Sequence, residues 1–163
     1  MWNKRPKRSP SILFGHLHNI SNMIIPGLEI KADDQELPWQ ETQVPGVHWL
    51  PLHLTPVPDS PGKPPERDPN KRSGGSVLIR MAPGSSYGAH RHLGPEEVLV
   101  LRGGYRDELG EYSTGRYVHY PAGSSHTPVA LGDPEAEESH ANPACILFAV
   151  ASGGIELLGR DES

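Results

Sequence analysis

Two histidines and two glutamates lie within eight residues of the sequence, in the segment HRHLGPEE at residues 90–97. Successive side chains of a β-strand point to opposite faces, so His90 and His92 would present two imidazoles on the same face. Two neighbouring imidazoles are the beginning of a transition-metal site. An ordinary surface pair of histidines has the same spacing, so the pair alone leaves both interpretations open.

A carboxylate follows the histidine pair closely enough to join it. The residues LGP at 93–95 predict a turn, after which the chain re-enters a strand at Glu96. If the two strands pair as an antiparallel hairpin, the Glu96 carboxylate reaches the same metal, and one short segment supplies three ligands. Strand alternation allows only one of Glu96 and the adjacent Glu97 to face inward.

Glycines bracket this segment, and a second element follows it. Gly84 and Gly103 lie on either side of the histidines and glutamates, where they let the backbone turn out of and into two strands. The segment GRYVHYPAGSSH at residues 115–126 then combines two glycines and a proline with a final histidine. Its tight turn places the imidazole of His126 at the start of a strand.

These two elements resemble the two sequence motifs of the cupin superfamily. The first matches at every signature position, and the second departs only at Ala130, where the family pattern has an asparagine that is not a metal ligand. Residues 78–132 are similar to the ChrR-like cupin domains, a group that includes the metal-binding half of certain anti-sigma factors and oxygenases resembling acetylacetone and dihydroxyacetophenone dioxygenases. With residues 38–54, which fit the first strands of that group, the resemblance covers about two-thirds of the chain.

The resemblance implies an all-β fold, a single cupin domain built as a double-stranded β-helix or jelly-roll barrel. It carries over a ligand set for one divalent transition-metal ion, and the ChrR-like spacing favours Glu96 over Glu97. Iron(II) and zinc are the leading ions for this set, and manganese(II) and nickel(II) also suit three imidazoles and a carboxylate. The implied ligands are His90, His92, Glu96 and His126.

Two classes of function follow from such a site. An iron(II) ion with open coordination positions implies a dioxygenase-like metalloenzyme that acts on a small oxygenated organic molecule. A zinc ion with every position closed implies a structural site or a sensor. A metal or redox sensor related to the cupin half of ChrR-type anti-sigma factors is therefore the alternative, although the chain lacks the clustered cysteines and the helix of the domain with which those regulators hold a sigma factor.

The rest of the chain predicts the short strands and turns that such a fold needs. Eighteen glycines and eighteen prolines punctuate the sequence and leave few windows with helical spacing. The segment RDELGEY at residues 106–112 predicts a hairpin tip. Strand-like patterns occur at residues 47–56, 76–83, 96–104, 115–123 and 145–154.

Three segments fall outside this pattern. Residues 1–20 predict a mobile N-terminal tail, because terminal runs of basic residues are usually solvated, and their apolar stretch is too short for a signal peptide. Residues 56–75 and 131–143 are polar, rich in proline, glycine or acidic residues, and predict long surface loops. We therefore expect one domain over residues 21–163, and the 131–143 loop is a candidate lid over the metal mouth.

Three residues near the metal motifs are candidates for catalytic roles. Alternation from Glu96 places Arg102 on the inward face, where it would bind an anion, and an ion pair at the end of the barrel is the alternative. Tyr87 precedes the histidine pair and Tyr105 follows a glycine turn, so their hydroxyls can reach a ligand or their rings can simply pack. His119 can face either side of its strand.

Composition narrows the functional classes further. The single cysteine, Cys145, excludes an internal disulfide, is interpreted as a packed core residue, and favours a cytoplasmic location. A net charge of −5 lacks the basic footprint of a nucleic-acid-binding protein. No apolar stretch approaches the roughly 20 residues that span a bilayer. We expect a small-molecule substrate, no nucleic acid and no membrane.

The resemblance also implies a homodimer. Cupin barrels commonly pair through strands near the N-terminus, and residues 20–55 contain apolar side chains for such a contact. The candidates are Ile24, Ile25, Leu28 and Trp49.

Overall fold

The computed structural model describes residues 37–55, 71–72 and 74–159, which form β-strands and no helix. The all-β fold expected from the sequence is confirmed. The predicted tail at 1–20 and most of the predicted loop at 56–75 lie outside the described residues. The same holds for three of the four apolar residues expected at a dimer contact, Ile24, Ile25 and Leu28.

The described strands form three antiparallel sheets. In spatial order, the six-stranded sheet contains β1 (Gln40–Glu41), β2 (Val47–Leu54), β4 (Gly75–Met81), β12 (Cys145–Ala151), β6 (Glu96–Arg102) and β9 (Tyr117–Tyr120). The four-stranded sheet contains β10 (Ser125–His126), β5 (His90–His92), β13 (Ile155–Leu157) and β3 (Lys71–Arg72). The three-stranded sheet contains β11 (Val129–Ala130), β7 (Gly104–Asp107) and β8 (Gly110–Ser113).

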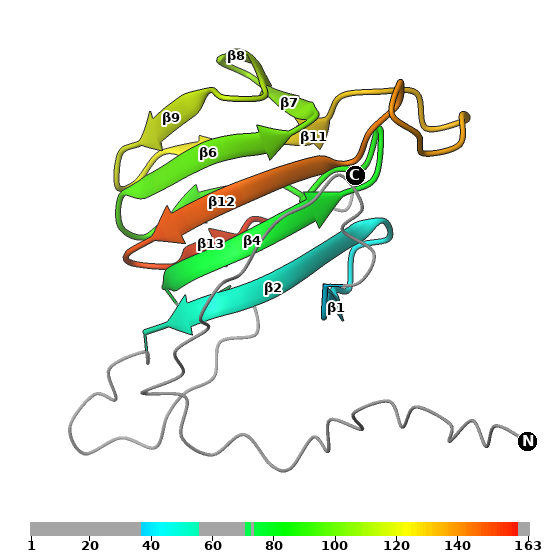
Figure 1. The fold of residues 1–163 in the computed structure, drawn as a ribbon. Helices are drawn as coiled ribbons and strands as arrows, with labels where there is room; N and C mark the ends of the chain where they lie inside the picture. The colour runs from blue at the N-terminus through cyan, green and yellow to red at the C-terminus, as the bar shows by residue number, and fades with distance from the viewer. Residues whose placement is uncertain (1–36, 56–70, 73, 160–163) are drawn as a thin grey trace, which may run out of the picture.

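The sheets lie in two layers, with the six-stranded sheet in front of the other two in Figure 1. Strand β6 shows why the core lies between the layers: Glu96, Val98 and Val100 are buried, whereas Glu97 and Leu99 are exposed. This is the alternation of a strand with one face toward the core. The central strand β12 pairs with both β4 and β6, and its sequence CILFAVA is accordingly apolar throughout.

The strands β5 and β6 do not form the hairpin predicted from the sequence. β5 pairs with β10 and β13 in the four-stranded sheet, whereas β6 pairs with β12 and β9 in the six-stranded sheet. The turn at residues 93–95 therefore carries the chain from one layer to the other. Glu96 faces the histidines from the opposite layer, not from a neighbouring strand.

The turn at residues 93–95 packs on a second turn, at residues 152–154, which connects β12 to β13. The two turns contact each other through their backbones. The amide of Leu93 donates to the carbonyl of Gly154 at 3.0 Å, and the amide of Ser152 donates to the carbonyl of Pro95 at 3.1 Å. Gly94 and Gly153 face each other between these bonds, and a Cβ built on Gly153 would lie 2.7 Å from the Cα of Gly94. Both positions need glycine because no side chain fits between the two turns.

A Gly153→Ala variant is expected to be less stable by about 1–3 kcal/mol, the usual cost of forcing an extra methyl into a packed site. Separation of the two turns would also move β5 relative to β6. Urea denaturation measures the loss of stability, and Gly159→Ala is the matched control because a Cβ there meets nothing within 4 Å. Equal unfolding midpoints for the two variants would contradict this account of the turn.

Candidate metal centre

Four buried side chains converge between the layers, and they are the four that the sequence motifs single out. One ligand atom from each of His90, His92, Glu96 and His126 lies within 4.8 Å of the others. The exposed fractions of these residues are 4%, 1%, 7% and 5%. Charged and polar groups are almost never buried in this way unless they are paired or bind a ligand.

Strand register explains how residues far apart in the sequence meet. His90 and His92 are the buried first and third residues of β5, with the exposed Arg91 between them. In the pairing of β10 with β5, His126 lies directly opposite His90. Three imidazoles therefore come from the four-stranded sheet, and Glu96, the first residue of β6, supplies the carboxylate from the other layer.

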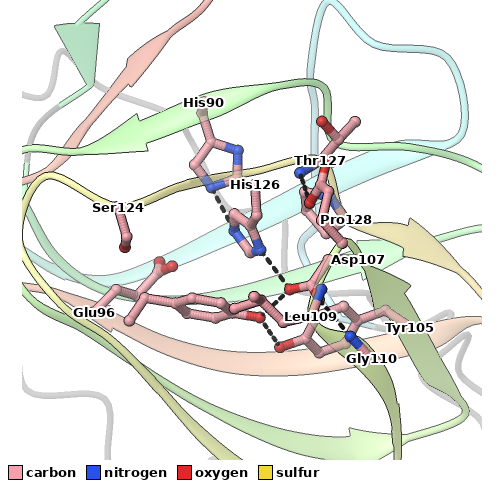
Figure 2. Close-up of polar contacts among 12 residues, drawn as sticks. His90, Glu96, Tyr105, Asp107, Leu109, Gly110, Ser124, His126, Thr127 and Pro128 are labelled. Atoms are coloured by element: carbon pink, nitrogen blue, oxygen red, sulfur yellow. Dashed lines mark hydrogen bonds and ion pairs between the residues drawn. The ribbon is translucent and has the colours of Figure 1, made fainter.

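Hydrogen bonds at the outer nitrogens assign the tautomers of two imidazoles. The Nδ1 of His90 lies 3.0 Å from the carbonyl oxygen of Gly88, which can only accept. The Nδ1 of His126 lies 2.9 Å from Oδ2 of Asp107, shown beside it in Figure 2. Each Nδ1 therefore carries the proton, and each Nε2 presents a lone pair.

A hydrogen bond to Ser124 assigns the same tautomer to His92. The hydroxyl of Ser124 donates its only proton to the carbonyl of Pro121 at 2.6 Å. Its oxygen therefore accepts from Nδ1 of His92, which lies 3.0 Å away. The Nε2 of His92 is left with a lone pair, and this buried atom has no hydrogen-bond partner.

With these tautomers the inner atoms of the cluster repel one another unless a cation lies among them. The Nε2 atoms of His126 and His90 are 3.0 Å apart, and Nε2 of His92 is 2.9 Å from Oε2 of Glu96. When the imidazoles are neutral, as metal ligands must be, no imidazole proton bridges either contact. Three imidazole lone pairs and a carboxylate aimed at one point are the donor set of a divalent transition-metal ion, so the cluster can hold one.

Burial keeps the imidazoles in the form that binds a metal. Desolvation lowers the pKa of His90 to about 4 despite the hydrogen bond to Gly88, which opposes the shift. Desolvation also lowers the pKa of His126, although Asp107 opposes it. Both groups are therefore neutral at pH 7, as a metal ligand must be.

Asp107 is a functional residue that the sequence interpretation missed. It ends β7 at a two-residue turn, so the hairpin tip predicted for residues 106–112 is confirmed. Burial by itself would raise the pKa of the Asp107 carboxyl, but hydrogen bonds from Tyr120, His126 and a backbone amide bring it below its usual range. Aspartate is common at turns, so its position at residue 107 did not indicate that its carboxylate would reach His126.

A small cavity of about 60 Å³ adjoins the cluster and is lined by His90, Glu96 and His126. Glu96 is the only charged side chain among the described residues that line it, and the lining contains no lysine or arginine. The remaining wall is predominantly apolar and includes Val77, Ile79, Met81, Val98, Leu147 and Ala149.

A second cavity, of about 230 Å³, shares two lining residues with the first, Trp49 and Tyr87. Its other described lining includes Glu41, Thr42 and Gln43, so it is more polar. Trp49, expected from the sequence at a dimer contact, is only partly buried but lines both cavities. Trp49 and Tyr87 therefore border both cavities, of which we call the first the inner cavity.

The three catalytic candidates have different surroundings. Tyr87 lines the inner cavity, and its ring meets that of His90 edge-on with centroids 5.4 Å apart. Tyr105 also lines the cavity, but its hydroxyl faces that of Tyr120 at 2.7 Å. Arg102 does not line the cavity and lies 3.7 Å from Glu138, which is the ion pair at the barrel end that the sequence left as the alternative.

The remaining sequence candidates lie away from the cluster. Glu97 and His119 are exposed and oppose each other across β6 and β9. Cys145 is fully buried, so its interpretation as a core residue is confirmed, and burial raises the pKa of its thiol to about 12. No residue of the 131–143 loop lines the inner cavity. In the part of the chain that the structure describes, no helix is long and apolar enough to cross a membrane.

Residues 67–137 match the family model of the ChrR cupin-like domain. The resemblance seen in the sequence motifs is thereby confirmed. Two of the structural matches below, with TM-scores of 0.52 and 0.53, agree with a cupin jelly-roll. No curated protein matches the chain.

Three solved structures show the range of the likeness. The complex of SigE with the anti-sigma ChrR from Rhodobacter sphaeroides matches at 23% identity with a TM-score of 0.49, over 73% of this chain and 50% of that chain. A protein with a cupin-like fold from Ralstonia eutropha JMP134 matches at 19% identity with a TM-score of 0.52, over 71% of this chain and 60% of that chain. An acetylacetone dioxygenase from Acinetobacter johnsonii matches at 15% identity with a TM-score of 0.53, over 90% of this chain and 88% of that chain.

The coverage differs among these structures. This chain spans 50% of the first structure's chain and 60% of the second's, but most of the dioxygenase. At such identities the likeness shows a shared fold, and function has to be argued from the site.

Proposed function

Because the chain has the cupin fold and residues 67–137 match the ChrR cupin-like domain, we propose that it is a mononuclear metalloenzyme that acts on a small, uncharged organic molecule. Its four ligands are His90, His92, Glu96 and His126. The observation that carries the proposal is the convergence of three imidazole lone pairs and one carboxylate beside an apolar cavity.

The protein's own residues bind and orient both the ion and the substrate. The buried ligands hold the ion between the two layers, and the apolar wall excludes water from the space beside it. An iron(II) ion bound there would supply the redox chemistry for a reaction with O₂. Tyr87, which contacts His90 and lines the cavity, is the residue we assign to contact the substrate.

The apolar character of the cavity lining favours a neutral substrate. A carboxylate substrate would enter a site whose described lining contains the negative Glu96 and no cationic side chain. A bound divalent ion would change the net charge of the site to +1, but a carboxylate substrate would still have to be desolvated against a predominantly apolar wall. A neutral β-dicarbonyl compound with two oxygens for the metal and an apolar body suits the lining, and the Acinetobacter protein of similar fold is named for its action on acetylacetone.

Elemental analysis of protein purified without added metal, combined with O₂ uptake, tests the proposal. We expect iron together with uptake on acetylacetone or on hydroxyaryl ketones, and no uptake on oxalate, which is a small dianion. Iron without uptake on any neutral substrate, or uptake on oxalate alone, would contradict the proposed reaction class.

A metal-dependent regulator is the second candidate, favoured by the match to the ChrR cupin-like domain. A thiol-based redox sensor needs an accessible cysteine of low pKa, whereas Cys145 is fully buried with a pKa of about 12. A sensor in this chain would therefore act through its metal. Stoichiometric zinc without O₂ uptake on any substrate would favour this candidate.

The proposal includes a cytoplasmic location and a homodimer. A reducing compartment is compatible with a single cysteine that is buried and unpaired. Sedimentation equilibrium at micromolar concentration tests the dimer, and a monomer there would remove it from the proposal.

A further inference from the structure

We propose that Asp107, Tyr120 and Tyr105 form a positioning chain that holds His126 with its Nε2 turned toward the other three ligands. The inference rests on the proposed metal site and concerns one imidazole of that site. Such a chain matters because His126 belongs to β10, a strand of only two residues that pairs with β5 alone. So short a strand fixes the ring poorly, and side-chain contacts must set its orientation.

The first contact is the carboxylate of Asp107. Its Oδ2 accepts from Nδ1 of His126 at 2.9 Å, and the side chains of the two residues are 0% and 4% exposed. Its Oδ1 accepts from the amides of Leu109 at 2.8 Å and Gly110 at 3.2 Å. The β7–β8 turn therefore fixes the plane of the carboxylate, and Figure 2 shows the group extending from that turn to His126.

The second contact is a pair of buried phenols with a fixed direction of donation. Tyr120 donates its hydroxyl proton to Oδ2 of Asp107 at 2.6 Å. The oxygen of Tyr120 is then free only to accept, so Tyr105 donates to it at 2.7 Å. Both tyrosines are 1% exposed, so water does not compete for these bonds.

The positioning chain and His126 together include residues from all three sheets. Asp107 and Tyr105 belong to β7 of the three-stranded sheet, Tyr120 to β9 of the six-stranded sheet, and His126 to the four-stranded sheet. The Tyr120 ring also packs on two ligand imidazoles, with centroids 4.2 Å from His126 and 5.1 Å from His92. The orientation of His126 is therefore set by contacts to every sheet of the barrel.

These residues position a ligand, and their hydroxyls do not act on a substrate. The proton of Tyr105 is donated to Tyr120 and that of Tyr120 to Asp107, so neither is directed into the cavity. Tyr105 is nevertheless among the residues that line the cavity. The positioning chain thus gives a role to two buried phenols and a buried carboxylate that the proposed chemistry does not otherwise use.

The Asp107→Asn variant provides the sharpest test. An asparagine keeps one oxygen for the turn amides but places an NH₂ group where Oδ2 stood, facing two donors. His126 can then pair with that group only as an acceptor at Nδ1, which moves its proton to Nε2 and removes the lone pair from the site. We expect zinc affinity, measured by competition with a chromogenic chelator, to fall roughly 10–100-fold.

The tautomer of His126 is the readout that a merely structural role would not change. In metal-free protein, long-range ¹H–¹⁵N correlation spectra should place the proton on Nδ1 in the wild type and on Nε2 in Asp107→Asn. Tyr120→Phe keeps both ring contacts and is expected to lose roughly threefold to tenfold in zinc affinity, the value of one hydrogen bond. Tyr117→Phe is the control, because Tyr117 lies on the same strand and is 58% exposed.

The outcomes separate this inference from the proposed function. If the wild type binds zinc and Asp107→Asn binds it equally well with an unchanged His126 tautomer, the positioning chain is wrong. If the asparagine variant does not fold, an unchanged zinc affinity in Tyr120→Phe overturns the chain. If the wild type binds no divalent ion, the proposed function fails. The His126 tautomer measured in metal-free protein still tests whether the positioning chain is correct.

Discussion

A Glu96→Gln variant is expected to lose divalent-metal affinity by on the order of 100-fold or more, since residues that only orient a ligand are already worth roughly 10–100-fold. The substitution replaces the one anionic ligand of the cluster by a neutral amide of almost the same size. The buried position of Glu96 leaves no water to take over as an equivalent ligand. Isothermal titration with zinc, and with iron(II) under anaerobic conditions, measures the change.

The neighbouring residue offers a matched control for this variant. Glu97→Gln makes the same chemical change one position along β6, where the side chain is exposed and faces away from the cluster. We expect its metal affinity to equal that of the wild type. If Glu97→Gln weakened binding and Glu96→Gln did not, the ligand set would have to be redrawn with the other carboxylate.

Removal of the metal is expected to lower the melting temperature by roughly 5–10 °C. An ion that binds only the folded state at a hundred times its dissociation constant stabilises it by about 2.7 kcal/mol. For a chain of 163 residues each kcal/mol shifts the melting temperature by roughly 2–4 °C. The physical cause is the repulsion among three imidazole lone pairs and a carboxylate once the cation is withdrawn.

Differential scanning calorimetry with and without a chelator measures this shift. The Glu96→Gln variant serves as the control, because a protein that binds the metal about 100-fold more weakly has little metal-dependent stability to lose at the same metal concentration. An identical melting temperature for chelated and metal-loaded wild type would mean that the ion does not bind this cluster in the folded state.

Local periodicity was enough to predict the main strands and that only one of Glu96 and Glu97 faces inward, whereas the choice of Glu96 came from the resemblance to ChrR-like domains. The strand patterns at 47–56, 76–83 and 145–154 correspond to β2, β4 and β12. Alternation along β6 distinguishes the buried Glu96 from the exposed Glu97. These inferences depend on burial against a single core, which the sequence records directly in the order of apolar and polar residues.

The pattern of apolar and polar residues did not predict which strands pair with one another. The turn at 93–95 has the composition of a hairpin turn, yet it crosses between layers because the backbone of residues 152–154 binds it from the side. Nothing in the local sequence records a contact formed some 60 residues away. The same reason hides Asp107, whose partner His126 lies 19 residues further along the chain.

A bulge explains why Arg102 does not follow the alternation that began at Glu96. In the pairing of β12 with β6, Leu147 lies opposite Val100, and the preceding residue, Ile146, lies opposite Arg102. Leu101 is thus an extra residue in β6, and the period of two is broken just before Arg102. Arg102 pairs with Glu138 at the end of the barrel as a result.

The crossing between layers has one further consequence. A bound ion would join His90, His92 and His126 of one layer to Glu96 of the other, through bonds that bypass the turn at 93–95. A bulky guest that enters the inner cavity has to spread the two layers, and in doing so it would stretch those coordination bonds. The size of the largest substrate that fits the cavity would then depend on whether the metal is bound and how strongly its coordination bonds resist stretching, as well as on the side chains of the wall.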